Sequence, residues 1–594
     1  MAITVTHGPS LRLPFAAVIG DFDVPAYPPT TAAEMAERFS QWLPMNICER
    51  LPAQGALDNL PYWVARVAQA ITEARGSMNL PVNSGSRQRR GWVALSYYDA
   101  PATVRALQFS LSATLNALLH ADSTVNTRLR AEAAVNMQLL RQPDSQARAL
   151  MRVARARKMP VYPVAGGSLI WQYGQGRKAQ HCYTSATQSD STTGVLLQQD
   201  KMHSNALVRQ LGLPGVEHGV AAWMQQALAF ARQFGYPLVV KPLDSGGGRG
   251  VTVNVNNPDE VKTAFTYAMK WSRKRRVIVE KFVAGKDYRI MVAGGKFLWA
   301  IRRMPPEVVG DGASSMAALI EQKNARIPAA DVENKFANRV AVDDELRRLL
   351  ALQQMNLETC PPAGKVVQLR ANANVATGGS FVDVSKDIHP DNREMAEVIA
   401  RAFRLDSAGL DFLTTDIGRS WHEGSCAIIE VNATPGLVSD DQAEKLVDNL
   451  FARGDNGRIP SILLLCRSPV ARHQLFAGLT NLPQGTGVLT RMEAQLNGCV
   501  RSFGKQSDAG TAAQALLLDP ACDALVAICT ANEVRQHGLP LDHFDVCAQV
   551  EDAEYDKALH ELLNTSCDKA IKISAASVAE TLRNLLLQAA EKPV

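Results

Sequence analysis

The feature that most constrains the fold is a short apolar run followed directly by a glycine-rich loop. Residues 238–240 (LVV) predict a buried strand, which leads through Lys241 into the loop SGGGRG at residues 245–250. Glycines let backbone N–H groups approach anionic oxygens closely, and Lys241 and Arg249 add full positive charges. The spacing fits neither a P-loop nor a dinucleotide-binding fingerprint, so the loop by itself favours a hairpin with a glycine tip over a phosphate site. The rest of the chain reverses that preference.

Composition and charge restrict the classes of function. The chain has 594 residues, enough for several domains, and its 46% hydrophobic and 20% charged content is that of an ordinary soluble protein. The net charge of +5 is not gathered into long Lys/Arg blocks, so we expect no nucleic-acid partner. No apolar run is long enough to cross a membrane and the N-terminus carries no signal-like pattern, so we expect a cytoplasmic protein without membrane contact. The ten cysteines include no CxxC pair, which indicates reduced thiols and no zinc site.

The first 160 residues predict an α+β domain. Apolar residues recur at helical spacing in residues 35–43, 63–75 and 103–119, and residues 92–98 predict a strand. This part contains no catalytic constellation. We therefore interpret residues 1–160 as a domain that holds substrate or supports assembly.

Oxygen ligands for a cation follow two predicted strands later in the chain. Residues 410–413 predict a strand that leads to Asp416, and residues 427–431 predict one that carries Glu430, with Asn432 two residues later. Because side chains alternate along a strand, Glu430 and Asn432 point to the same side. Mg²⁺ prefers one or two carboxylates beside substrate phosphates. The alternative is that Asp416 and Glu430 are strand-end carboxylates facing solvent, although charges on such apolar strands need a partner.

Several separate motifs resemble, in order and spacing, those of the ATP-grasp carboxylate–amine ligases and, more closely, the cyanophycin synthetases. The motifs are Lys201, KPLD followed by GRGV, VIVEKFVAGKDYRI, LRANANVATGGSFVDVSKDIHPDN and IIEVNATPG. The resemblance is strong over residues 165–460 and faint before them. It implies an α/β and α+β multidomain chain, with an N-terminal α+β domain (1–160), a central ATP-grasp domain (161–455) and a C-terminal α/β domain (456–594).

The C-terminal part resembles a truncated Mur-ligase-like domain. In the cyanophycin synthetases the segment GRIP, here residues 457–460, leads into a phosphate loop of the type GTNGKTT. In this chain the same segment is followed by SILLLCRSP, which lacks the glycines, Lys and Thr of that loop, and the chain stops at Val594. We therefore expect a single ATP site. The loss of the second site resembles the type-2 cyanophycin synthetases, which join ready-made β-aspartyl-arginine dipeptides.

The resemblance also implies a role for individual residues. Lys201 and Lys241 are expected to hold the α- and β-phosphates of ATP, and Glu280 the adenine and ribose edge. The loop expected to cover the γ-phosphate consists of Gly246, Gly247, Gly248, Arg249 and Gly250. Mg²⁺ is expected on Asp416, Glu430 and Asn432. Arg289 and Arg303 are expected to act with Lys241 in catalysis by gripping the substrate carboxylate or the tetrahedral intermediate. The residues expected around the incoming acceptor are Arg370, Asn374, Thr377, Gly378 and Gly379.

The leading hypothesis is an ATP-dependent ligase, expected as a homo-oligomer, that extends a cyanophycin-like polymer through an acyl phosphate. A second hypothesis is the same chemistry on a different amino acid or dipeptide, because Gly246 and Gly247 stand where the family usually has Asn and His. A third is a non-catalytic paralogue that binds polymer or a full-length synthetase. The complete set of candidate phosphate and metal residues argues against the third hypothesis, since a chain that only binds has no need of all of them.

Overall fold

The computed structural model describes most of the chain, in two compact units. The residues it describes are 1–27, 30–41, 43, 45–48, 50–51, 59–73, 80–119, 129–130, 132, 143–166, 168–244, 250–326, 339–370, 373, 375–479, 481–504, 507–550 and 556–590. Unit 1 consists of Met1–Tyr183 and Phe451–Val594, and unit 2 is the continuous insertion Thr184–Leu450. Residues 161–183, expected to open the ATP-grasp domain, thus group with unit 1. The division into three domains itself stays a prediction.

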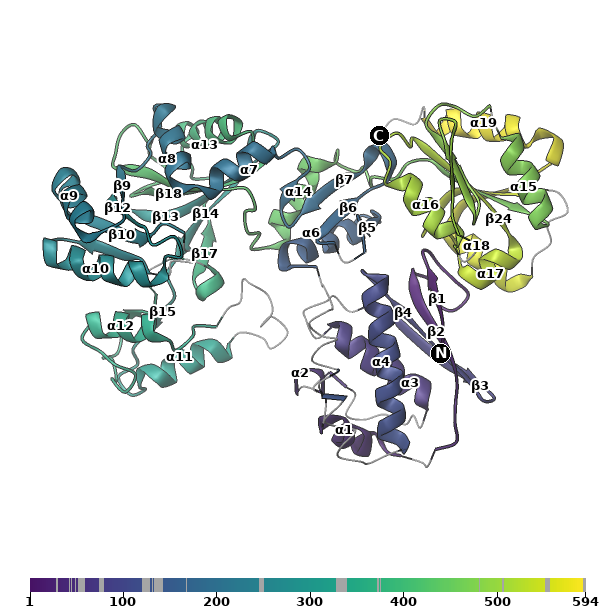
Figure 1. Ribbon diagram of the computed structural model, residues 1–594, viewed down its shortest axis with the longest axis horizontal. Coiled ribbons are helices and arrows are strands. Elements are labelled where there is room, and N and C mark those ends of the chain that lie inside the picture. Colours follow the sequence, from purple (N-terminus) through teal and green to yellow (C-terminus); the bar gives the residue numbers. More distant parts are fainter. Residues whose placement is uncertain are drawn as a thin grey trace. The chain divides into compact units, whose positions relative to one another are not determined.

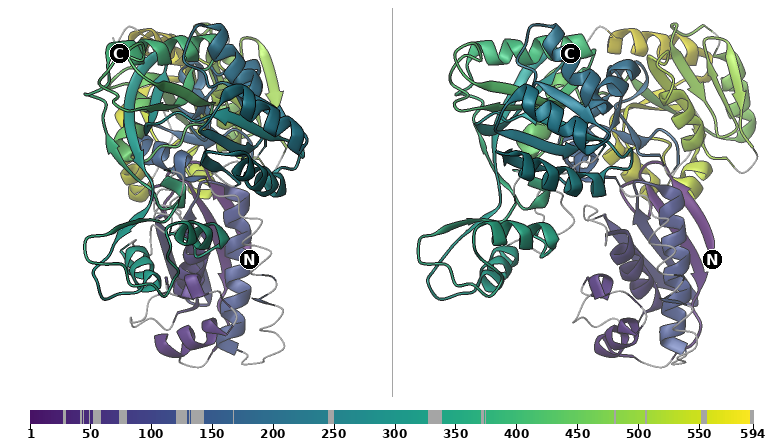
Figure 2. Two further views of the ribbon diagram at one scale, coloured as in Figure 1. Left: turned by 90° about the vertical axis from the view of Figure 1, so that its left-hand side faces the viewer. Right: turned by 60° about the vertical axis from the view of Figure 1, so that its left-hand side comes forward.

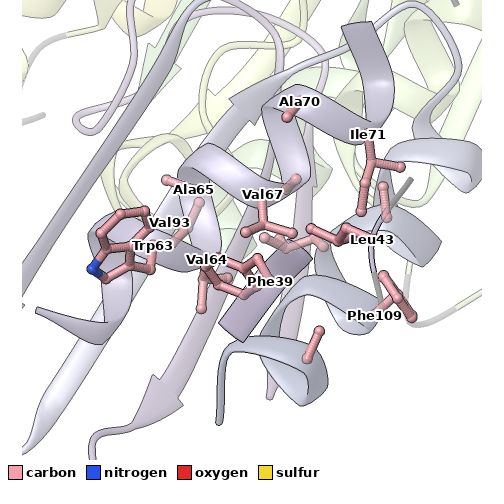
Figure 3. Close-up of a cluster of buried hydrophobic side chains, with 14 of the residues drawn as sticks. Phe39, Leu43, Trp63, Val64, Ala65, Val67, Ala70, Ile71, Val93 and Phe109 are labelled. Carbon is pink, nitrogen blue, oxygen red and sulfur yellow. The ribbon is translucent and has the colours of Figure 1, made fainter. Parts of the chain in front are cut away.

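Unit 1 begins with an antiparallel sheet in the order β1-β2-β4-β3, which we call the N-terminal sheet. Helices α3 and α4 pack together on one face of this sheet, as the views in Figure 2 show. Their core includes Phe39, Val64 and Val67, whose side chains lie close together in Figure 3. The elements are β1 (Ala2–Thr6), β2 (Ala17–Asp23), α1 (Ala32–Ser40), α2 (Met45–Cys48), α3 (Leu60–Glu73), β3 (Val82–Arg87), β4 (Arg90–Ser96) and α4 (Ala100–Leu119).

A short connecting region of unit 1 joins its two halves. Backbone hydrogen bonds run from Gln175 N to Gly457 O (2.9 Å) and from Arg177 N to Cys522 O (3.0 Å), and Lys178 forms an ion pair with Asp455 at 3.1 Å. These contacts explain why residues 161–183 belong with unit 1. The elements are α6 (Ser145–Ala156), β5 (Val161–Pro163), β6 (Ile170–Tyr173), η1 (Gly176–Lys178), β7 (Gln180–Tyr183) and β8 (Ala186–Thr187), the last of which lies in unit 2.

The second half of unit 1 is an α/β layer structure around a mostly parallel sheet, which we call the C-terminal sheet. Its order is β23-β22-β21-β24-β20-β25-β26. Helices α16, α17 and α18 cover one face, and α15 and α19 cover the other (Figure 1). The elements are β20 (Ser461–Cys466), α15 (Pro469–Gly478), β21 (Thr486–Leu489), β22 (Glu493–Leu496), β23 (Cys499–Ser502), α16 (Ala509–Leu517), β24 (Ala524–Thr530), α17 (Ala531–His537), β25 (Phe544–Val550), α18 (Lys557–Ser566), β26 (Cys567–Ile573), η4 (Ala575–Ser577) and α19 (Val578–Ala590).

Unit 2 contains an antiparallel sheet in the order β11-β10-β12-β9, the β10 sheet, with α9 and α10 beside it in Figure 1. Leu238, Val240, Val277 and Val279 alternate onto the helix side, where they form a core with α9 and α10. The opposite face is therefore left to the residues between them. The elements are α7 (Thr192–Gln199), α8 (Lys201–Gln210), β9 (His218–Ala221), α9 (Met224–Phe234), β10 (Leu238–Pro242), β11 (Thr252–Val255), α10 (Pro258–Trp271) and β12 (Val277–Lys281).

The larger sheet of unit 2 has the order β17-β14-β13-β18-β19, and we call it the β13 sheet. Tyr288, Ile290, Leu410 and Phe412 face a core built with α13, so the residues that alternate with them lie on the other face. A small sheet of β15 and β16 packs with α11 and α12. The elements are β13 (Lys286–Ala293), β14 (Lys296–Met304), β15 (Glu307–Val309), α11 (Met316–Ala325), α12 (Asp344–Leu352), β16 (Val366–Gln368), η3 (Val375–Thr377), β17 (Ser380–Asp383), α13 (Pro390–Phe403), β18 (Ser407–Thr414), β19 (Cys426–Asn432) and α14 (Asp440–Leu450).

Among the described residues, none of the helices has both the length and the apolar character needed to cross a membrane. The ten cysteines are free thiols, and those that are buried include Cys466 and Cys529 on neighbouring strands of the C-terminal sheet.

Candidate active site

Lys201 lies beside the predicted metal ligand Glu430. Asp200 caps helix α8 by accepting hydrogen bonds from the backbone N–H groups of Met202 (2.9 Å) and His203 (3.1 Å), so the helix begins at Lys201. The Lys201 Nζ atom is 3.6 Å from Glu430 Oε1. The structure thus brings together a lysine expected to hold phosphate and a carboxylate expected to hold metal, although they are 229 positions apart in the sequence (430 minus 201).

Lys241 and Glu280 form a buried ion pair on the open face of the β10 sheet. The Lys241 Nζ atom lies 2.6 Å from Glu280 Oε1, and each side chain is only 10% exposed. They occupy neighbouring strands β10 and β12, on the side opposite α9 and α10. Glu280, expected at the adenine and ribose edge, is therefore the described counter-ion of Lys241. The ion pair holds the lysine side chain in a fixed direction, which suits a phosphate ligand.

The glycine loop is described only at its two ends, and Gly246, Gly247, Gly248 and Arg249 lie outside the described residues. At one end, burial opposes ionisation of Asp244, yet hydrogen bonds from Ser272 Oγ (2.7 Å) and Lys274 N (3.0 Å) lower its pKa. At the other end, Gly250 has a φ of +76°, and an added Cβ would lie 2.7 Å from Pro242 and 2.8 Å from Trp271. Both ends of the loop thus lie close to the C-terminal end of α10.

The open face of the β13 sheet carries a cluster of two arginines and two aspartates. Arg289 Nε donates to Asp411 Oδ1, while Arg303 donates through Nε (3.0 Å) and Nη2 (2.6 Å) to Asp287 Oδ1. Arg303 Nη2 also lies 3.1 Å from Asp411 Oδ2. Strand register builds the cluster, since Asp287 pairs directly with Arg303 and Arg289 with Asp411. The two catalytic arginines predicted from the sequence therefore lie together, and they share one carboxylate.

Electrostatics keep the shared carboxylate ionised. Burial opposes the charge on Asp411, but Arg289 and Arg303 outweigh it, so the pKa of Asp411 lies below its ordinary value. Burial raises the pKa of Asp287; Arg303 opposes that rise and the charge on Asp411 adds to it. The guanidinium of Arg303 is stabilised in turn, because both aspartates raise its pKa against the effect of burial.

The metal ligands predicted from the sequence are only partly brought together. Glu430 and Asn432 lie two residues apart on β19, and the residue directly opposite Glu430 on β18 is Asp411. Asp416 lies beyond the end of β18, is exposed, and accepts a hydrogen bond from Gly418 N at 2.9 Å. The position opposite Glu430 thus belongs to Asp411. The signal that identifies it in the sequence is its place inside an apolar strand, where a charge needs a partner more than one in a turn does.

The residues expected around the acceptor do not gather in one place. Arg370 is 3% exposed and binds Asp343 (3.0 Å) and the carbonyl of Ala341 (2.8 Å), next to the small sheet of β15 and β16. Thr377 ends η3, and Gly378 and Gly379 lead directly into β17, whose Phe381 pairs with Arg303. Asn374 lies outside the described residues. The loop at residues 377–379 therefore adjoins the arginine cluster, whereas Arg370 is held by its own neighbours.

The sequence predicts that the strand at residues 461–465 is not followed by a phosphate loop. In the structure, the polar side chains that follow this strand contact one another. After β20, Ser468 Oγ caps helix α15 by accepting from Ala471 N at 3.2 Å. Arg472 on that helix forms an ion pair with Glu533 on α17, and the two side chains are 12% and 11% exposed. Thr530 and Glu533 in turn form a capping box at the start of α17. The polar groups at this end of β20 and β24 thus form hydrogen bonds and an ion pair with one another.

Comparisons with known proteins agree with the central part of this structure. Residues 200–292 match the family model described as carbamoyl-phosphate synthase L chain, ATP binding domain, and this range contains Lys201, Lys241, Glu280 and Arg289. The chain is 35% identical over 325 residues to cyanophycin synthetase from Trichormus variabilis, in an alignment covering 52% of this chain and 35% of the relative. It is 31% identical over 408 residues to cyanophycin synthetase from Synechocystis, covering 66% and 46%.

The chain is related to the cyanophycin synthetases. It spans less than half the length of these two curated relatives. Among solved structures, it is similar to the bifunctional glutathione synthetase from Pasteurella multocida, with a TM-score of 0.41, 19% identity, and coverage of 59% of this chain and 52% of the other. The expected α/β and α+β multidomain architecture with a central ATP-grasp, ATP-binding domain is confirmed. The likeness of the C-terminal domain to Mur ligases stays a prediction.

Proposed function

We propose that this protein is an ATP-dependent carboxylate–amine ligase that joins β-aspartyl-arginine dipeptides into cyanophycin or a closely similar polymer. The observation that carries the proposal is the open face of the β13 sheet. That face places Arg289, Arg303 and Asp411 in one cluster, with Glu430 opposite Asp411 and Lys201 beside Glu430. The similarity to cyanophycin synthetases supports the choice of substrate.

An amide forms from a carboxylate only if an oxygen is first turned into a good leaving group. In the proposed reaction the carboxylate at the polymer end attacks the γ-phosphorus of ATP, the bond to ADP breaks, and an acyl phosphate results. The amine of the next dipeptide then attacks the acyl carbon, and phosphate leaves. Transfers of this kind depend on positioning and charge stabilisation. Lys201 and Lys241 supply positive charge to the phosphates, and Arg289 and Arg303 grip the substrate carboxylate.

The donor atoms near Lys201 fit Mg²⁺. Glu430 and Asp411 offer carboxylate oxygens from facing positions of two strands, and Asn432 offers an amide oxygen from the same strand as Glu430. Within the described ranges no three His, Cys, Asp or Glu side chains are grouped to hold a metal ion, and Mg²⁺ does not require three, because phosphate oxygens and water complete its octahedron. When bound, Mg²⁺ would supply positive charge to the β- and γ-phosphates. Asp411, in place of Asp416, joins Glu430 and Asn432 in the proposed set.

The proposal is tested by following ADP release and analysing the product by mass. The purified full chain would be given ATP and Mg²⁺ with aspartate, arginine, both amino acids together, β-aspartyl-arginine, or dipeptides related to it. The expected result is ADP release with β-aspartyl-arginine and a product ladder whose spacing is one dipeptide residue. Absence of ADP release with every substrate would contradict the ligase, and a ladder built from another dipeptide would contradict the substrate.

We further expect one nucleotide site per chain. The end of β20, where a second phosphate loop would begin, is closed by the Ser468 cap and the Arg472–Glu533 pair. Titration with a non-hydrolysable ATP analogue should therefore give a stoichiometry of one. Free aspartate and arginine should then yield no polymer, since no second centre attaches arginine to a side-chain carboxylate. A stoichiometry of two that survives Lys241→Ala would place a working site in the C-terminal domain.

A further inference from the structure

The β10 sheet and the small sheet of β15 and β16 are separate bodies within unit 2, because each has its own hydrophobic core. Helices α9 and α10 contribute to the first core, and α11 and α12 contribute to the second. Bodies with separate cores move relative to one another unless a contact between them prevents it. Such a contact matters for the proposed reaction, because the first body carries Lys241 and the second leads into residues 370–379, which we call the candidate acceptor loop.

Helix α10 adjoins both ends of the glycine loop. The ring of Trp271, the last residue of α10, would lie 2.8 Å from a Cβ added at Gly250. Ser272, directly after the helix, donates a hydrogen bond of 2.7 Å to Asp244 at the other end of the loop. Tyr267 precedes Trp271 by four residues, so the two side chains lie on the same side of α10. A contact made by Tyr267 therefore acts on the helix that adjoins the glycine loop.

Helix α12 holds the start of the candidate acceptor loop at both of its own ends. At the N-terminal end, the cap residue Asp343 accepts two hydrogen bonds of 3.0 Å from Arg370, whose side chain is only 4% exposed. At the C-terminal end, the cap residue Gln353 donates a hydrogen bond of 2.9 Å to Gln368 O. Gln368 is the last residue of β16, and Arg370 follows it by two positions. The position of α12 therefore sets where this loop begins.

A cation–π contact joins α10 to α12. The guanidinium carbon of Arg348 on α12 lies over the ring of Tyr267 on α10, 5.1 Å from the ring centroid. The Arg348 Nε atom is buried and makes no hydrogen bond within the described part of the chain. Arg348 thus meets α10 through the face of an aromatic ring, which attracts a cation electrostatically. This contact links the body that carries Lys241 to the body that leads into the candidate acceptor loop.

We propose that Tyr267 and Arg348 are positioning residues, which hold the candidate acceptor loop in place relative to the nucleotide-binding sheet. This inference rests on the proposed ligase function and adds a coupling between its nucleotide and acceptor halves. Attack by the acceptor amine requires the amine and the acyl phosphate to meet in one geometry, and a small displacement of either lowers the rate steeply. While the contact is made, α10 and α12 keep one separation, so the loop that begins at Arg370 keeps one distance from Lys241. Both residues act through the helices that carry them.

The first test is a double-mutant cycle between Tyr267 and Arg348, measured by dipeptide-dependent ADP release. Tyr267→Leu removes the aromatic face and Arg348→Met removes the charge, while each keeps an apolar side chain in place. Each single change is expected to lower kcat/KM for β-aspartyl-arginine about 3- to 10-fold, and the double variant should lose no more than either single variant. Tyr267→Phe keeps the ring and should stay within about twofold of the parent.

The second test measures the coupling by binding. Without dipeptide, the Kd of a non-hydrolysable ATP analogue should stay within about twofold of the parent value in Tyr267→Leu and Arg348→Met, because the contact lies outside the proposed phosphate site. Saturating β-aspartyl-arginine should lower that Kd in the parent, and the factor should shrink toward one in both variants. A parent Kd that does not respond to dipeptide would overturn the inference, as would an equal response in the parent and the variants.

Controls separate positioning from folding and from failure of the proposed function. Arg347→Met changes the exposed neighbour of Arg348 on α12 and should leave kcat/KM unchanged. Additive losses in the double variant would overturn the inference, as would a loss in Tyr267→Phe equal to that in Tyr267→Leu. If both single variants lose thermal stability and nucleotide affinity as much as kcat/KM, the contact is only structural and the inference fails. A parent chain without dipeptide-dependent ADP release would overturn the proposed function itself, whereas additive losses in an active parent overturn the inference alone.

Discussion

The β13 sheet and the C-terminal sheet differ in how many of their faces are covered. On the β13 sheet, one face packs against α13, and the other carries Asp287, Arg289, Arg303, Asp411 and Glu430. Strands β20 and β24 of the C-terminal sheet are buried at every residue, and their clusters lie on both faces. A parallel sheet covered by helices on both sides has no face left for ionisable groups, whereas an antiparallel sheet covered on one side does. The ionisable groups of the β13 sheet therefore lie together on one face, where we propose that they bind a ligand, whereas the Arg472–Glu533 pair of the C-terminal domain lies beyond the strands and has only a structural role to fill.

The largest expected effect tests the open face directly. Glu430→Gln keeps the shape of the side chain and removes its charge, so it should abolish ligation, with a loss of at least 10²- to 10³-fold, as expected for a pre-organised charge site. Asp411→Asn should be similarly damaging. The matched control is Asp416→Asn, an exposed carboxylate beyond the end of β18, which should change kcat less than twofold. Steady-state ADP release measures all three variants. A large loss of kcat in Asp416→Asn together with a normal kcat in Asp411→Asn would instead support the metal ligands predicted from the sequence, which include Asp416 and not Asp411.

The next effect concerns the β10 sheet, whose open face carries the Lys241–Glu280 pair. Lys241→Ala removes a positive charge from the proposed phosphate site and should cost a few kcal/mol of transition-state stabilisation, about 10²-fold in rate. It also leaves Glu280 buried without a partner, so thermal unfolding should be measured alongside kcat. Lys281→Ala on the same strand as Glu280 is the control, since Lys281 is exposed. A loss of kcat of less than tenfold in folded Lys241→Ala protein would indicate that the glycine loop is a hairpin turn and not a phosphate site.

The strands of unit 2 could be read from the sequence with some accuracy. The strand predicted at residues 238–240 lies within β10, and those predicted at 410–413 and 427–431 lie within β18 and β19. These elements can be predicted because each is marked by a local run of apolar residues. In the N-terminal part, the helices predicted at 63–75 and 103–119 correspond to α3 and α4.

The ion-pair partners of the charged residues could not be predicted from the sequence. The sequence places Glu280 next to Lys281, but its described partner is Lys241, which register brings across from another strand. The sequence predicts Asp416 as a metal ligand with Glu430, and only the β18–β19 register shows that Asp411 is the carboxylate that faces Glu430. Such pairings depend on strand register, and a shift of one residue would move each side chain to the other face. Arg370 shows the same limit, because its partner Asp343 lies 27 positions away.

The C-terminal sheet should respond to charge changes in stability and not in catalysis. Arg472→Met leaves Glu533 buried and unpaired, which is expected to lower the free energy of unfolding by about 3–5 kcal/mol. The kcat of the folded protein should not change. Urea unfolding and ADP release measure the two quantities. Arg535→Met is a control on the neighbouring helix, because the Arg535–Asp556 pair is more exposed (33% and 58%) and should cost at most about 1 kcal/mol. A loss of kcat from Arg472→Met without a loss of stability would contradict the contrast between the two sheets.

The smallest expected effect is a dependence of the free energy of unfolding on pH. It arises in unit 1, where the buried imidazole of His7 lies beside Asp508, the N-cap residue of helix α16. Burial lowers the pKa of His7, against the attraction of Asp508, whose Oδ1 lies 3.5 Å from His7 Nε2. Because the folded pKa is below the unfolded value of about 6.5, the unfolded chain binds more protons, and stability should fall as the pH drops below that value. Each unit of pKa difference is worth about 1.4 kcal/mol. Urea unfolding from pH 7.5 to 5 should show a slope that His7→Gln reduces, whereas His473→Gln, at an exposed histidine, should leave it unchanged. An unchanged slope in His7→Gln would mean that His7 takes up its proton without opening the packing around it.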